Sequence, residues 1–143
     1  MADTIISSLR DYFLKCPLTG DSILGVDYLP ERGIAYSIDT TPANEIVERY
    51  ISGSSLRQYL FVFRSVNDYG SQALQNMSNS GFFERLAAWL ERQSKLRNLP
   101  VLGAGQFPRR IEAQSTGYLF TAGTDTGKYQ IQCRLIYFQK GTR

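Results

Sequence analysis

Apolar residues near the start of the chain recur at the three- to four-residue spacing of one helical face. They are Ile5, Ile6, Leu9, Phe13 and Cys16. Asp3 or Thr4 can cap the first turn, and Pro17 ends the pattern because the residue before a proline is disfavoured in helical geometry. We therefore expect a helix over residues 5–16.

Two short apolar segments follow, at residues 22–29 and 34–38, and both are expected to be strands. Between them lies Pro30-Glu31-Arg32-Gly33, in which proline and glycine are typical turn residues. The second strand is therefore expected to pair back on the first.

A second strand pair is expected at residues 45–51 and 56–66, joined across Ser52-Gly53-Ser54-Ser55. From Arg57 to Phe63 the sequence changes from polar to almost continuously apolar. A strand covered on both faces has this composition. We therefore expect one face of this strand to lie on helices and the other on a neighbour.

The central region predicts a second helix from Phe82 to about Arg97, with a separate short helical turn at residues 72–77. Asn79 or Ser80 would cap it, and Glu84 would lie in its first turn, where a carboxylate is favourable. Its apolar side consists of Phe82, Phe83, Leu86, Trp89 and Leu90, and its polar side of Glu91, Arg92, Lys95 and Arg97. We interpret the apolar stripe as core packing.

After Asn98-Leu99-Pro100 has stopped this helix, the glycines and Pro108 indicate an irregular, mobile loop over about residues 98–110. Residues 111–120 and 128–138 are expected to form a final hairpin around a turn at residues 123–127. In the return strand, Tyr129, Ile131, Cys133, Leu135 and Tyr137 alternate with Lys128, Gln130, Gln132 and Arg134. This alternation predicts one apolar and one polar face.

The order of elements predicts an α+β fold with a mostly antiparallel sheet of about five to six strands, packed against an N-terminal helix and a central helix. The chain has 143 residues, of which 43% are apolar and 13% aromatic, which is enough for one domain over residues 1–143. No apolar run approaches the ~18–20 residues of a membrane span, and Met1-Ala2-Asp3 does not begin a secretory signal.

The composition argues against an enzyme. The chain has no histidine, which removes Ser–His and Cys–His nucleophile pairs and the commonest general base. Gly103-x-Gly105 is too short for a phosphate-binding loop, and no Gly-x-Ser-x-Gly elbow occurs. We therefore predict no catalytic residue, no metal ligand and no cofactor. Cys16 and Cys133 are expected to be buried, reduced thiols.

Charge is distributed unevenly along the chain, although the net charge is only +3. Residues 1–70 hold six Lys or Arg against nine Asp or Glu, a balance of −3, and residues 71–143 hold ten against four, a balance of +6. Such an asymmetry could bring the acidic face of one copy onto the basic face of the next. The alternative is that the charges only solvate two halves of the surface.

Two segments are candidates for an interface. Gln130, Gln132 and Arg134 form the polar face of a long strand, which could be a solvated surface or could dock another chain. Phe107, Arg109 and Arg110 lie in the expected loop, which could become ordered when a neighbouring subunit arrives.

Several blocks of the sequence, in order along nearly the whole chain, resemble one known family. They are Ser55-Leu56-Arg57-Gln58-Tyr59-Leu60-Phe61-Val62-Phe63, Asn79-Ser80-Gly81-Phe82-Phe83, Asn98-Leu99-Pro100-Val101-Leu102, Gly117-Tyr118-Leu119-Phe120, Asp125-Thr126, and Tyr129-Gln130-Ile131-Gln132-Cys133-Arg134-Leu135. The chain resembles the minor capsid proteins of phages and prophages of Gram-positive bacteria, a family that occupies the tail-terminator position in the virion. An N-terminal helix ending in Cys16-Pro17 agrees with this pattern.

The resemblance implies a structural protein of the virion, located at the head-proximal end of the tail and assembled in the host cytoplasm. Tail terminators form a ring, commonly a hexamer, that caps the tail tube, stops its polymerisation and provides the surface for head joining. The implied partners are further copies of the chain, the major tail tube protein and the connector proteins of the neck. Genomic DNA could pass through such a ring without specific recognition, and no membrane is involved.

Two other classes stay open. Another neck component, such as a head-completion or tail-to-head joining protein, would share the size, the lack of histidine and the ring. A small transferase is the more distant alternative, and it would have to work without histidine.

Overall fold

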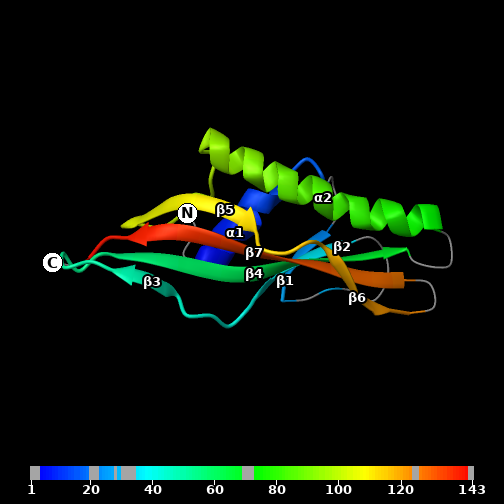
Figure 1. The fold of residues 1–143 in the computed structure, drawn as a ribbon, viewed down its shortest axis with the longest axis horizontal. Helices are drawn as coiled ribbons and strands as arrows, with labels where there is room; N and C mark the ends of the chain where they lie inside the picture. Colours follow the sequence, from blue (N-terminus) through cyan, green and yellow to red (C-terminus); the bar gives the residue numbers. More distant parts are fainter. Residues whose placement is uncertain are drawn as a thin grey trace.

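The computed structural model describes residues 4–19, 23–27, 29, 35–68, 73–123 and 126–141, and within them it contains two helices and one sheet of seven strands (Figure 1). The elements are α1 (Ile5–Leu14), β1 (Ile23–Val26), β2 (Ala35–Thr40), β3 (Ile46–Arg49), β4 (Ser55–Asp68), α2 (Ala73–Leu96), β5 (Gln106–Ala113), β6 (Tyr118–Ala122) and β7 (Thr126–Gln139). The predicted α+β class is confirmed, with a mixed sheet.

The first helix begins at a reciprocal cap. Thr4 Oγ1 accepts a hydrogen bond from the backbone N–H of Ser7, and Ser7 Oγ accepts one from the backbone N–H of Thr4. This capping box satisfies two backbone donors that the first helical turn leaves without partners. The predicted cap is thus Thr4, while the alternative cap, Asp3, lies outside the described residues.

Two long strands form the spine of the sheet. β4 and β7 are 14 residues long and pair antiparallel over their whole length, from Ser55 opposite Gln139 to Asp68 opposite Thr126. At one end of this pair, β3 lies beside β4 and β5 lies beside β7. At the other end, β2 lies beside β4, with β1 next to β2, and β6 lies beside β7. The hairpin of β3 and β4 was predicted.

The first strand pair differs from the prediction, because β1 and β2 are parallel and not a hairpin. Ile23 lies opposite Ala35, and Val26 lies opposite Ile38. Eight residues separate the two strands, and most of them lie outside the described part of the chain. Asp27 leaves β1 in a left-handed conformation, with φ of 53°, and the predicted turn at residues 30–33 lies outside the described residues.

The second helix also differs from the prediction, because α2 is continuous from Ala73 to Leu96 and does not begin at a cap near residue 80. Asn79 is buried, and its Nδ2 lies 3.5 Å from the hydroxyl of Tyr129 on β7. It therefore bonds across to the sheet instead of capping a helix. Tertiary packing here outweighs the cost of Gly81 within the helix, about 1 kcal/mol.

The loop expected at residues 98–110 is shorter, because β5 begins at Gln106 and includes Phe107, Arg109 and Arg110. Pro108 is tolerated because β5 ends the strand order, where a missing N–H is harmless, and the register shifts between Pro108 and Arg110. The single strand expected at residues 111–120 is instead two, β5 and β6, which both pair with β7.

Both helices pack on one face of the sheet (Figure 1). The predicted inward residues of β7 are all buried there, and they contact the buried rings of the N-terminal helix, the central strand and α2. These inward residues are Tyr129, Ile131, Cys133, Leu135 and Tyr137. The opposite face, which we call the outer face, carries no described helix. Its side chains include Arg64, Glu112, Gln130, Gln132 and Arg134.

Candidate functional site

The six predicted interface residues lie at two places on the sheet. Gln130, Gln132 and Arg134 project from β7 on the outer face, as the alternation predicted. Phe107, Arg109 and Arg110 lie on β5, the strand that ends the sheet. Two of the six, Arg110 and Arg134, contact the same carboxylate.

That carboxylate belongs to Glu112, which stands opposite Arg134 in the register of β5 and β7. Its two oxygens lie 2.8 Å from Arg110 Nε and 2.9 Å from Arg134 Nε. Arg134 also donates to the side-chain oxygen of Gln58 on β4, at 3.4 Å. Because charge-assisted bonds to a shared acceptor hold side chains in place, this cluster fixes two arginines on the outer face.

Sequence reasoning missed Glu112. A signal was present, because Glu112 is two residues from Arg110 and two-residue spacing puts side chains on one face of a strand. The pairing of Glu112 with Arg134 depends on the register between β5 and β7, which the sequence does not specify at the irregular start of β5.

A second polar cluster surrounds Gln130. Its side-chain oxygen accepts from Arg64 Nε at 3.1 Å, and its nitrogen donates to the hydroxyl of Tyr118 on β6. Arg64 in turn forms an ion pair with Asp39 at 2.8 Å, and Asp39 accepts a hydrogen bond from the hydroxyl of Ser37 at 2.6 Å. These side chains therefore form a connected polar network on the outer face that spans β2, β4, β7 and β6.

Aromatic residues lie beside the arginines at the β5 end of the sheet. The ring of Phe138 is 6.2 Å from the ring of Phe107 and 6.2 Å from that of Tyr50. The guanidinium carbon of Arg109 lies 5.4 Å from the Phe138 ring centroid, within the range of a cation–π contact. Phe107 is 51% exposed, and partly exposed aromatic and arginine side chains are the types enriched at protein interfaces.

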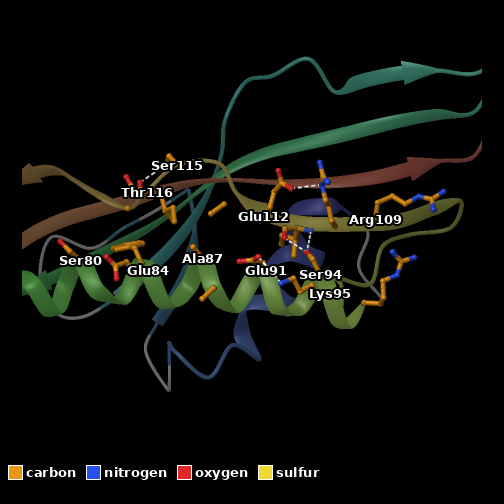
Figure 2. A pocket seen from close by; sticks show the side chains of 18 residues that line it. Ser80, Glu84, Ala87, Glu91, Ser94, Lys95, Arg109, Glu112, Ser115 and Thr116 are labelled. Carbon is orange, nitrogen blue, oxygen red and sulfur yellow. Dashed lines mark hydrogen bonds and ion pairs between the residues drawn. The ribbon is translucent and has the colours of Figure 1, made fainter.

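A groove of about 940 Å³ lies between α2 and β5. In Figure 2 it lies between the helix and the strand, and Ser94 projects from α2 towards β5. Ser94 Oγ donates to the carbonyl of Ile111 at 2.6 Å and accepts from the N–H of Ile111 at 3.0 Å. The hydroxyl therefore satisfies both backbone groups of one residue on the outer edge of β5, and it serves the structure of that edge.

Metal binding, thiol reactivity and membrane crossing have little structural support in the described part of the chain. No group of three or more Cys, Asp or Glu there is arranged to hold a metal ion. Cys16 and Cys133 are free and buried, as predicted, and burial raises the pKa of both thiols. Neither described helix combines the length and the apolar character that crossing a membrane requires.

Comparison of the chain with protein-family models and with curated proteins gives no match in either case.

Proposed function

We propose that this chain is a ring-forming structural protein of the phage tail, of the terminator type. The supporting observation is the outer face, where Glu112 binds Arg110 and Arg134 and a second polar network, around Gln130, spans four strands. A sheet face that no described helix covers, carrying ion-paired arginines with aromatic residues beside them, has the character of a protein-docking surface. The sequence blocks that resemble tail terminators support the same assignment.

In this proposal the two helices stiffen one side of the sheet, and the other side and the sheet edges contact neighbours. Ring closure needs head-to-tail contacts between unlike surfaces, because a contact between identical surfaces closes as a dimer. A cap also needs one end that matches the tail tube and another that matches the neck. Neither task requires a catalytic residue or a cofactor.

Electron microscopy of particles from a phage or prophage that lacks this gene tests the proposal. Tails that are overlong or irregular in length, and not joined to filled heads, are expected, and normal tails should return when the gene is supplied on a plasmid. Tails of normal length that fail to join heads would instead assign the protein to another position in the neck. Intact infectious particles would refute both roles.

A further inference from the structure

A hollow of about 550 Å³ lies at the end of the sheet where β3 and β5 flank β4 and β7 (Figure 1). Its apolar lining comes from β4, β7 and the residue after β3, and consists of Leu56, Ile136, Phe138 and Tyr50. The other described residues that line it are all arginines, and no described carboxylate lines it. The hollow therefore combines an apolar surface with concentrated positive charge.

A bulge in β5 places two consecutive arginines, Arg109 and Arg110, beside this hollow. In a regular strand, neighbouring side chains point to opposite faces, so only one of the two could lie there. The register against β7 shifts between Pro108 and Arg110, and a bulge of this kind redirects a side chain. Arg110 lies opposite Ile136, and the guanidinium carbon of Arg109 is 5.4 Å from the centroid of the Phe138 ring. The irregular start of β5 thus brings both charges to one place.

The third arginine, Arg97, lies directly after α2 in a backbone conformation that usually belongs to glycine. The N–H of Asn98 donates to the carbonyl of Gln93 at 2.9 Å, and the N–H of Arg97 donates to the carbonyl of Ser94 at 3.2 Å. This pair of bonds is a Schellman ending, whose left-handed residue is most often glycine. Arg97 has a φ of 61°, which is unfavourable for a residue with a Cβ atom. Residues held in such conformations cluster at binding sites.

Two of the three arginines form no ion pair with a described residue. Arg110 binds Glu112, whereas no described carboxylate lies within ion-pair distance of Arg97 or Arg109. Both of these arginines are exposed. A guanidinium group can bind a carboxylate through two parallel N–H donors, and this geometry makes arginine suited to interface ion pairs. Arg97 and Arg109 therefore offer donors for a carboxylate beside an apolar surface.

We propose that this hollow binds an acidic segment of a partner protein. A carboxylate of the partner is held by Arg97 and Arg109, and an adjacent apolar side chain packs on Leu56 and Ile136. The partner is identified by complementarity, because it supplies the negative charge that the lining of the hollow lacks. The inference rests in part on the proposed function, since it names the chemistry of one docking contact.

A protein segment fits the hollow better than a nucleic acid does. Single-stranded nucleic acids bind by stacking bases on aromatic rings, but the guanidinium group of Arg109 already lies over the ring of Phe138. Glu112 binds one of the arginines that line the hollow. Glu48 accepts a hydrogen bond from the hydroxyl of Tyr50 at 3.4 Å. These two carboxylates would repel a continuous phosphate backbone, whereas a single carboxylate can stay at the arginines.

Selection from a library of random displayed peptides tests the proposal, with the purified full-length chain as the immobilised target. Peptides with Asp or Glu next to Leu, Ile or Phe should be enriched, because they supply both the carboxylate and the apolar side chain. A selected peptide is then made with a fluorescent label, and its affinity is measured by fluorescence anisotropy. Replacing its acidic residues with Asn or Gln should weaken binding about tenfold, since bonds to a charged group are lost.

The variant Arg97→Gly separates binding from folding. Glycine is the favoured residue at a φ of 61°, so the melting temperature should stay the same or rise. The affinity for the selected peptide should fall about tenfold, because one guanidinium group is lost, and Arg109→Gln should have a similar effect. The matched control, Arg92→Gln, removes the same charge from an exposed position on α2 outside the hollow. It should leave the affinity within about twofold.

Three results of the selection would overturn the proposal: no enriched peptide, enriched peptides without an acidic residue, or equal affinity of the selected peptide for the unmodified chain and for both Arg97→Gly and Arg109→Gln. A single strand of ten thymidine nucleotides is the nucleic-acid probe, and it should not displace the selected peptide. Displacement by this strand, together with loss of its own binding in Arg97→Gly, would assign the hollow to nucleic acid and refute the proposal.

The outcome is distinguishable from that of the gene-deletion experiment. Acidic peptides that require Arg97, together with tails of normal length, would keep the binding site and refute the terminator role. Overlong tails without any selected acidic peptide would keep the terminator role and refute this contact.

Discussion

Replacing Ser94 with alanine removes the group that covers the outer edge of β5. Its hydroxyl makes two hydrogen bonds to the backbone of Ile111, a residue that is 0% exposed although the bonds themselves are only part-buried beside the groove. A buried backbone group left without its partner costs about 1–3 kcal/mol. Alanine recovers about 0.5 kcal/mol through its helix propensity. Two groups are affected, and because their bonds are only part-buried each is expected at the low end of this range, which gives a net destabilisation of about 2 kcal/mol.

Urea denaturation followed by circular dichroism measures this change. With an m value of about 2 kcal/mol/M, the midpoint should fall by about 1 M while m stays constant. Ser80→Ala is the matched control, because Ser80 is exposed on the same helix and its replacement gains only the propensity. Ser94→Thr retains a hydroxyl and should recover part of the loss.

The reasoning is wrong if Ser94→Ala and Ser80→Ala change the midpoint equally. It is also wrong if Ser94→Ala lowers the midpoint and Ser94→Thr lowers it further, because the loss would then come from packing and not from the hydroxyl.

Three other predictions follow from the contacts described. Gly117→Ala should destabilise the fold by about 1–3 kcal/mol, since the new Cβ would lie 2.3 Å from Phe83 Cβ, and an unchanged melting temperature would contradict this. Burial raises the pKa of Tyr12, so the folded state keeps a proton that the unfolded state loses above about pH 10. The free energy of unfolding should therefore fall as the pH rises further. In urea titrations at several pH values, Tyr12→Phe should make this fall shallower. The double variant Arg109→Glu with Arg110→Glu should weaken assembly or tail docking, and unchanged tail capping would exclude this segment from the interface. Arg109→Glu alone is the cleaner variant, because Arg110 also binds Glu112.

Strong local patterns predicted much of the fold. The alternation in β7 correctly assigned its inward and outward residues, and the spacing of apolar residues correctly located α1 and the buried side of α2. Both signals depend on which side chains face the core, and burial of apolar surface is the dominant favourable contribution to folding. The buried positions were therefore predicted correctly even where strand pairing or helix bounds differed from the prediction.

Errors arose where local propensity competes with distant contacts. The turn sequence at residues 30–33 suggested a hairpin, but β1 is parallel to β2. The direction of a strand depends also on the elements that pack against it, and the local sequence does not specify them. Asn79 resembles a helix cap until its contact with Tyr129 is known. Pro108 and its neighbouring glycines suggested a loop, although an edge strand accepts a proline.

The candidate site was only half predictable for the same reason. Arg110 and Arg134 could be selected by residue type, but their connection through Glu112 exists only in the register of β5 against β7. Gln130 could be placed on the outer face, but its partners Arg64 and Tyr118 come from other strands.

The uneven charge of the chain acquires a physical meaning only when the strand order is known. If the halves of the sequence alternated across the sheet, their charges would mix and no direction would be favoured. Instead β4 and β7 are the boundary between them. Among the described residues, those up to residue 68 hold five Lys or Arg against six Asp or Glu, and those from residue 73 hold nine against three, so the positive charge gathers on the side of α2, β5, β6 and β7. A polar surface of this kind favours contacts between unlike edges, and repeated contacts between unlike edges generate a ring or a filament. Whether they close as a ring is then decided by the twist and curvature of the sheet.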